Sequence, residues 1–211
     1  MKKYAWLIAL LFAANTAFAE TTPLDASIAK LQHDWAAGFY QIPEKEKEAA
    51  FEKLVKEAHA VTVANPGRAE PLIWEGIITS TLAKYQSIFS AGGTAKAARD
   101  LLLAAEKIDA NALNGSALTS LGSLYYKVPR FGSFGDYDKA NEYLERALKI
   151  NPDGIDPNFF MGELMIERGD RAKALEYFKK ALNSPARTGR KDADTGRKAE
   201  IEAAISKIEK K

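Results

Sequence analysis

Cysteine is absent from this chain of 211 residues, and only two histidines are present. Without cysteine, the chain cannot form disulfides or thiolate metal sites, and it offers no cysteine for lipid attachment. His33 and His59 fall on separate amphipathic stretches with no second metal ligand at helical spacing, so we expect exposed or half-buried polar side chains. The sequence also lacks a glycine-rich phosphate loop, a His-Glu-x-x-His helix and a Gly-x-Ser-x-Gly turn. We therefore expect no metal site, no cofactor and no catalytic residue, and a protein that is not an enzyme.

The chain also has little net charge. Its formal charge at pH 7 is +2, and without Lys2 and Lys3 the remaining residues carry 28 basic and 28 acidic side chains. Such a balance provides no field that would attract nucleic acid or an anionic membrane. Acidic residues cluster at 44–52, but lysines alternate with them, which is typical of a solvated helix face.

The first 19 residues have the organisation of a secretory signal. Lys2 and Lys3 precede an apolar run at residues 4–14, and Ala17-Phe18-Ala19 is a small-x-small cleavage site. The run is shorter than the roughly 20 residues that a membrane-spanning helix needs. We therefore expect cleavage after Ala19 and a periplasmic protein without a membrane anchor.

Short motifs recur in the C-terminal half. Two segments each combine a glycine between large residues with a later set of regularly spaced alanines. In the first segment these positions are Leu118, Leu121, Gly122, Tyr125, Ala140, Leu144, Ala147 and Pro152, and in the second they are Asn158, Met161, Gly162, Met165, Ala174, Phe178, Ala181 and Pro185. Ala147 and Ala181 are 34 residues apart. This pattern resembles the tetratricopeptide repeat, a pair of helices that stacks on its neighbours.

Each repeated position has a steric reason. Gly122 and Gly162 let the paired helices approach closely, and large residues three or four positions away fill the space between neighbouring pairs. At the turns Gly135-Asp136 and Gly169-Asp170, we expect glycine to take a positive φ and aspartate to cap the next helix. The predicted fold class is all-α: a tetratricopeptide-like, right-handed solenoid of helical hairpins, with about four helical pairs and a C-terminal capping helix.

The distance from glycine to alanine shows where the repeat is interrupted. It is 12 residues in the last repeat, 18 in the middle one and 22 in the earlier one, from Gly76 to Ala98. We therefore expect two long connectors, one at residues 127–135 and one around residues 90–93.

The predicted organisation has four parts. They are a signal peptide at 1–19, a degenerate N-terminal helical pair at 20–66, repeats with long connectors at 67–186, and a charged C-terminal capping helix at 187–211. Within the last part we expect a helix from Arg197 to Lys210, with Ile201, Ile205 and Ile208 as its apolar stripe.

A longer combination of motifs resembles a known family. It resembles the T-component of tripartite ATP-independent periplasmic (TRAP) transporters. The similar motifs are Leu124-Tyr125-Tyr126-Lys127-Val128-Pro129, Phe134-Gly135-Asp136, Ala147-Leu148 followed by Asn151-Pro152-Asp153-Gly154-Ile155-Asp156-Pro157-Asn158, and Trp74-Glu75-Gly76-Ile77. The resemblance covers roughly residues 66–185. It implies a periplasmic protein that docks onto the solute-binding component of a transporter and handles a hydrophobic or organic-acid ligand. Members of that family are commonly lipoproteins, whereas this chain has no cysteine to lipidate.

We expect a partner to bind in the groove that the first helices of the pairs form. The groove should receive apolar and charged side chains, which suit a peptide or a protein edge. The connector at 128–134 adds aromatic and arginine side chains, which supply binding energy at contact surfaces, although its phenylalanines could instead fold back onto the core. The predicted binding residues are Ile77, Tyr126, Lys127, Arg130, Phe131, Phe134, Phe159, Glu163 and Glu167.

Two functions are compatible with these expectations. The first is a periplasmic protein-binding adaptor, whose partner would be the solute-binding protein of a TRAP-type transporter. The alternative is a carrier of a small hydrophobic or organic-acid ligand in a cavity between helices. With either function, the protein could assemble into a homo-oligomer.

Overall fold

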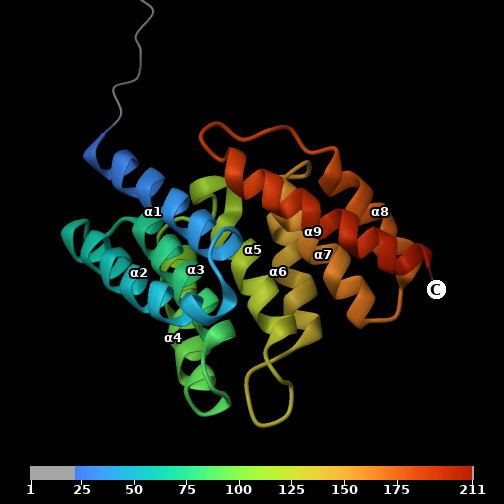
Figure 1. Ribbon diagram of the computed structural model, residues 1–211, viewed down its shortest axis with the longest axis horizontal. Coiled ribbons are helices and arrows are strands. Elements are labelled where there is room, and N and C mark those ends of the chain that lie inside the picture. Colours follow the sequence, from blue (N-terminus) through green and yellow to red (C-terminus); the bar gives the residue numbers. More distant parts are fainter. Residues whose placement is uncertain (1–21, 211) are drawn as a thin grey trace, which may run out of the picture.

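The computed structural model describes residues 22–210, which form nine helices and no strand. The helices are α1 (Pro23–Tyr40), α2 (Glu44–Ala64), α3 (Ala69–Tyr85), α4 (Ile88–Ile108), α5 (Ala112–Lys127), α6 (Tyr137–Ile150), α7 (Ile155–Glu167), α8 (Arg171–Leu182) and α9 (Lys191–Glu209). The first eight form four antiparallel pairs that stack in chain order, and α9 follows the last pair (Figure 1). The predicted all-α stack of about four pairs with a capping helix is confirmed.

The signal peptide predicted for residues 1–19 lies outside the described residues. Between Thr22 and Lys210, no helix combines the length and the apolar composition that crossing a membrane requires.

Three glycines hold the paired helices close together, as the sequence predicted. A Cβ atom on Gly122 would lie 3.1 Å from the carbonyl oxygen of Ala140, and one on Gly76 would lie 3.3 Å from that of Ala98. A Cβ atom on Gly162 would meet the ring of Phe178 at 2.7 Å. Any larger residue would therefore separate the first helix from the second in that pair.

The turn aspartates cap helices as expected, but only one of the two turn glycines has the predicted positive φ. Asp136 accepts hydrogen bonds from the backbone of Asp138 and Lys139, at 2.9 and 3.1 Å. Gly169 has the predicted positive φ of 81°. The same prediction for Gly135 is wrong, because Gly132 has the positive φ in that loop. At position 135 a side chain would collide with the carbonyl groups of Val128 and Pro129, so only glycine fits there.

One of the two predicted connectors is helical. The connector at 128–136 is a loop, but residues 90–93 lie inside the first turns of α4, and only Gln86 and Ser87 separate α3 from α4. The prediction of a long loop around Gly92-Gly93 is therefore wrong. Each glycine costs a helix about 1 kcal/mol relative to alanine, and the alanines that surround the pair offset this cost. The additional residues thus lengthen the α3/α4 pair.

The last helix begins at Lys191, six residues before the predicted start at Arg197. The carboxylate of Asp194 accepts a hydrogen bond of 2.9 Å from the backbone N–H of Arg187 and fixes the chain ahead of the helix. Ile201 is fully buried, and Ile205 and Ile208 are partly buried against the same core, as predicted.

The helix α9 also connects the two ends of the stack. The first helices of successive pairs contact one another in the order α1, α3, α5 and α7; α9 contacts α7 and α8, and it returns to α1 (Figure 1). These five helices therefore form a closed set, which we call the inner ring. The ring replaces the open groove that a simple row of helical pairs would have.

Candidate functional site

Tyr126, Lys127 and Glu163 form a compact cluster on adjacent helices of the inner ring. The hydroxyl of Tyr126 donates a hydrogen bond of 2.5 Å to Oε2 of Glu163, and Nζ of Lys127 lies 2.9 Å from the same oxygen. Burial and the neighbouring carboxylate raise the pKa of Tyr126 well above its ordinary value, so its hydroxyl remains a donor. The Lys127 side chain is 50% exposed and that of Glu163 is 32% exposed, so both remain accessible to a partner.

Phe159 lies beside this cluster, but α9 covers it. Its side chain is only 3% exposed and packs against Phe160 and Phe178. The guanidinium group of Arg197 lies 4.3 Å from the centre of the Phe159 ring and 4.9 Å from that of Phe160. The C-terminal helix thus occupies the position in which we expected a partner to contact Phe159.

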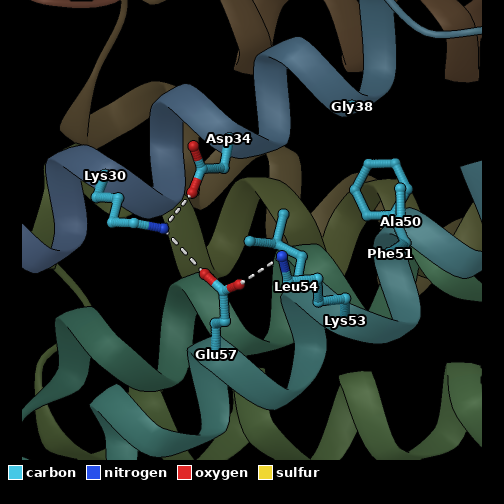
Figure 2. A pocket seen from close by; sticks show the side chains of 8 residues that line it. All are labelled: Lys30, Asp34, Gly38, Ala50, Phe51, Lys53, Leu54 and Glu57. Atoms are coloured by element: carbon cyan, nitrogen blue, oxygen red, sulfur yellow. Dashed lines mark hydrogen bonds and ion pairs between the residues drawn. The ribbon is translucent and has the colours of Figure 1, made fainter.

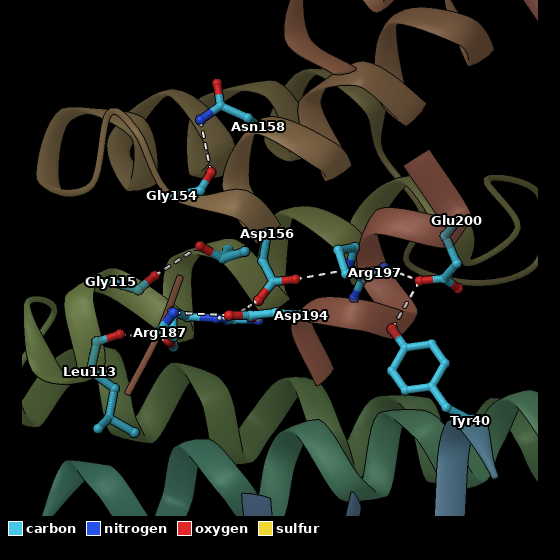
Figure 3. Close-up of polar contacts among 12 residues, drawn as sticks. Tyr40, Leu113, Gly115, Gly154, Asp156, Asn158, Arg187, Asp194, Arg197 and Glu200 are labelled. Carbon is cyan, nitrogen blue, oxygen red and sulfur yellow. Dashed lines mark hydrogen bonds and ion pairs between the residues drawn. The ribbon is translucent and has the colours of Figure 1, made fainter. Parts of the chain in front are cut away.

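A network of ion pairs holds α9 in this position (Figure 3). Arg197 donates to Asp156 at 2.9 Å and to Glu200 at 2.7 Å. Arg187 donates to the other oxygen of Asp156 at 2.6 Å, and the hydroxyl of Tyr40 in α1 donates to Glu200 at 3.0 Å. Burial alone would raise the pKa of Asp156, but the guanidinium groups of Arg187 and Arg197 outweigh it and hold that pKa well below its usual range. The network therefore joins α7 to α9 through ion pairs, and the hydroxyl of Tyr40 connects α1 to it.

Sequence reasoning missed most of this network. Asp156 belongs to the Asn-Pro-Asp-Gly-Ile-Asp-Pro-Asn motif, but Arg187, Arg197 and Glu200 follow no spacing rule that would identify their shared partner. Asn158 in the same motif is fully buried, and its amide donates to the carbonyl groups of Pro152 and Gly154 at 2.9 and 2.8 Å. In this part of the motif, Asn158 therefore stabilises the turn between repeats.

The loop between α5 and α6 places its two phenylalanines differently. Phe131 is 98% exposed. Phe134 is half-buried and lies edge-on to Tyr125, with 5.7 Å between the ring centres. The guanidinium group of Arg99 lies 4.7 Å from the centre of the Phe134 ring. One phenylalanine therefore folds back onto the core and the other points into solvent.

Of the remaining predicted residues, Arg130 and Glu167 lie near this loop, whereas Ile77 lies away from it. Arg130 lies 4.3 Å from the centre of the Tyr137 ring, and the Tyr137 hydroxyl donates to the exposed Glu167 at 3.1 Å. Tyr137 thus links Arg130 with Glu167. Ile77 is partly buried among the N-terminal core residues, so it joins neither group.

A second group of aromatic and charged residues lies where α1, α2 and α3 meet. Nζ of Lys84 lies 4.5 Å from the centre of the Phe39 ring and 5.2 Å from that of Tyr85, and Nζ of Lys47 lies 5.4 Å from Phe39. Burial lowers the pKa of Lys84, and burial together with the charge of Glu44 raises the pKa of Tyr85 to about 12. No motif in the sequence indicated this group.

Among the hollows on the surface of the described residues, two have volumes typical of small-molecule sites. One, of about 380 Å³, lies between α1 and α2 above Phe51 and Leu54 (Figure 2). Lys30 bridges Asp34 and Glu57 there at 2.6 and 2.9 Å, so its charge is already neutralised. The other, of about 480 Å³, lies under the α5–α6 loop, where Arg168 pairs with Asp138 at 2.7 Å. Neither hollow has the enclosed apolar lining typical of a small-molecule site.

Comparisons with known proteins agree with this architecture. The tetratricopeptide repeat family matches residues 133–188, which contain α6, α7 and α8. A search of curated proteins gives no match.

Among solved structures, the chain is similar to a thermophilic tetratricopeptide repeat protein of Thermus thermophilus. The two are 14% identical with a TM-score of 0.58, over 88% of this chain and 98% of that one. Two structures of MamA are 18% and 22% identical, cover 82% and 75% of this chain and 95% and 92% of their own, and have TM-scores of 0.46 and 0.36. From Thr22 to Lys210 the chain is therefore a tetratricopeptide-type helical repeat, with a recognised tetratricopeptide repeat at residues 133–188.

Proposed function

We propose that this chain is a periplasmic adaptor that binds a protein partner at the Lys127–Glu163 pair of the inner ring. The pair supports this role because both side chains remain partly exposed, although they form an ion pair between adjacent first helices. Lys127 also lies 5.4 Å from the centres of the Tyr126 and Phe160 rings, so charge and aromatic surface occur together. Such a combination supplies binding energy at protein interfaces.

The proposed partner is the solute-binding component of a TRAP-type transporter. The motifs at 124–129 and 151–158 support this choice, as does the secretory signal at the start of the sequence. Since Tyr126 and Phe159 are only 7% and 3% exposed, their replacement would disturb the core, so they are poor probes of binding. Lys127 is the better probe.

Reversal of the charge at Lys127 tests the proposal. We expect Lys127→Glu to weaken binding of the solute-binding protein at least tenfold in calorimetry, because it places like charges beside Glu163. Lys180→Glu is the matched control, since Lys180 is 47% exposed and also pairs with an aspartate, Asp153, but lies on the outer helix α8. Lys180→Glu should change affinity less than twofold.

Two results would reject different parts of the proposal, the identity of the partner and the location of its site. If the unmodified chain does not bind the solute-binding protein, the partner is wrong. If it binds and both charge reversals weaken it equally, the partner is right but the inner-ring site is wrong. The alternative function, a carrier of a small ligand, predicts additional mass on gently purified protein in native mass spectrometry; it has less support because the two hollows are open and contain ion pairs.

A further inference from the structure

Arg190 directly precedes α9 and differs from the two arginines that hold this helix in place. Arg187 and Arg197 between them pair with three carboxylates, those of Asp156, Asp194 and Glu200 (Figure 3). The guanidinium group of Arg190 makes no ion pair and no hydrogen bond with any residue between 22 and 210. The acidic groups of this region are thus already bound to its neighbours.

The side chain of Arg190 lies on a fixed aromatic ring. Its guanidinium carbon is 5.0 Å from the centre of the Trp74 ring, which belongs to α3 of the inner ring and is only 4% exposed. The backbone of Arg190 is held as well, because its N–H donates to the carbonyl group of Arg187 at 3.2 Å and its own carbonyl group accepts from the N–H of Asp194 at 2.9 Å. The ring contact alone therefore positions the guanidinium group.

Two N–H groups of this contact have no acceptor. Nε of Arg190 and Nε1 of Trp74 are both buried, and neither forms a hydrogen bond with a residue between Thr22 and Lys210. The other indole of this core is satisfied, since Nε1 of Trp35 donates to Thr81 at 2.9 Å. Buried donors in folded proteins normally have a partner, so two unsatisfied donors in one contact point to an acceptor from outside the chain.

The surroundings of Arg190 also leave its charge incompletely balanced. Burial, followed by the charge of Arg187, lowers the pKa of Arg190 to about 10, and the carboxylates of Asp156 and Asp194 counteract this lowering only in part. Arg190 still carries its positive charge near pH 7. A singly charged, planar carboxylate therefore suits it better than a phosphate, whose second negative charge Asp156 and Asp194 would repel.

We propose that Arg190 and Trp74 form a binding site for a carboxylate group. Arg190 is partly exposed, so the carboxylate reaches its terminal nitrogens from solvent and accepts two parallel hydrogen bonds from the guanidinium group. A small rotation of the Arg190 side chain, which no ion pair restrains, allows the indole N–H of Trp74 to donate as well. This site shares no residue with the Lys127–Glu163 pair, so it goes beyond the adaptor function.

Calorimetric titration with propionate tests the proposal, with phosphate and chloride as competing anions. We expect saturable binding of propionate, at least tenfold tighter than binding of either inorganic anion. Arg190→Gln and Trp74→Phe should each weaken propionate binding at least tenfold, because the first removes the charge and the second removes the N–H but keeps an aromatic ring.

Arg146→Gln is the matched control. The guanidinium group of Arg146 also lies over an aromatic ring, 5.3 Å from the centre of Tyr143, but it is already paired with Glu106. This variant should change propionate affinity less than twofold. Lys127→Glu should also leave it unchanged, so failure of the adaptor proposal and failure of the carboxylate site can be distinguished.

Three outcomes would overturn the proposal. The first is absence of saturable propionate binding, and the second is equally tight binding of chloride or phosphate, which would indicate an unselective positive charge. The third is an equal loss of affinity in Arg146→Gln and Arg190→Gln, because binding would then not be located at Arg190.

The carboxylate has two possible sources, a free organic acid or an acidic group of a protein partner. Competition separates them. If propionate and Arg190→Gln both weaken the complex with the solute-binding protein, that protein supplies the carboxylate. If propionate binds at Arg190 and the complex is unaffected, the ligand is a free acid.

Discussion

The hydroxyl of Tyr40, at the end of the first helix, donates a hydrogen bond of 3.0 Å to Glu200 in the last helix. These residues are 160 positions apart in the sequence, and Gly196 lets α9 approach the Tyr40 ring. In an open stack each helical pair contacts only its neighbours, so the ends unfold independently. Closure by α9 couples the first pair to the last one, and we expect residues 22–210 to unfold more cooperatively than an open stack.

Replacement of Gly196 tests this closure. A Cβ atom on Gly196 would lie 2.5 Å from ring atoms of Tyr40, so we expect Gly196→Ala to destabilise the chain by about 1–3 kcal/mol in urea unfolding. Gly92→Ala is the control, since Gly92 is also helical but has no atom within 4 Å of such a Cβ. The control should gain roughly 0.5–1 kcal/mol. Equal gains in both variants would show that α9 does not pack on α1.

Asp156 should make the stability of the folded chain depend on pH in the acidic range. Its pKa is lower in the folded chain than the value of about 3.9 in an unfolded one, so its contribution is present above pH 4 and is lost as pH falls through the folded pKa. We expect the thermal midpoint to fall as the pH decreases below about 5 and to continue falling below about pH 3, and to fall less steeply in Asp156→Asn.

The asparagine variant should also be less stable at neutral pH. It leaves Arg187 and Arg197 without their shared carboxylate, so we expect a loss of about 3 kcal/mol at pH 7. Asp153→Asn is the matched control, because Asp153 lies three residues away with a 74% exposed side chain. If both variants keep the pH slope of the unmodified chain, Asp156 does not carry the dependence.

The two loop phenylalanines should differ in their effect on stability. Phe134→Ala removes the ring that packs on Tyr125 and under Arg99, and because the ring is only half-buried we expect a loss of about 2 kcal/mol. Phe131→Ala should change the free energy of unfolding by less than about 0.5 kcal/mol, since its side chain has no buried contacts to lose. Guanidinium titration of both variants measures the difference, and equal losses would contradict the loop geometry.

The start of α5 should tolerate only certain residues. Leu113, Asn114 and Gly115 have positive φ values of 49°, 57° and 74°, and Asn114 is exposed, so its substitution reports mainly on the backbone. We expect Asn114→Val to cost about 1–2 kcal/mol, because β-branched residues disfavour the left-handed region. Asn114→Gly should be close to neutral. Similar midpoints for the two variants in thermal unfolding would indicate a right-handed start of the helix.

Much of the repeat could be predicted from the sequence because its determinants are local. Gly122 with Ala140, and Gly162 with Ala174, define pairs of helices whose approach depends on small side chains at fixed spacing. The caps at Asp136 and Asp170 follow from turn chemistry within a few residues. The same local reasoning failed at Gly92 and Gly93, because glycine is compatible with both a loop and a helix.

The candidate site was harder to predict. The contact of Tyr126 with Glu163 follows from the repeat register, since both belong to first helices of adjacent pairs. The covering of Phe159 by Arg197 does not, because it depends on where the chain leads after the last repeat. Sequence position likewise offered no reason for Phe134 to pack on Tyr125 while Phe131 stays exposed.

The sequence by itself determined the helices, their pairing and their order, because these follow from periodic small and apolar residues over a few tens of positions. Only the tertiary structure decided that α9 returns to α1, that Asp156 joins two arginines, and that the α3–α4 turn and the α5–α6 loop share one edge. The superhelical path of the whole stack brings these distant groups together, and that path is the sum of many small packing angles that no local pattern encodes.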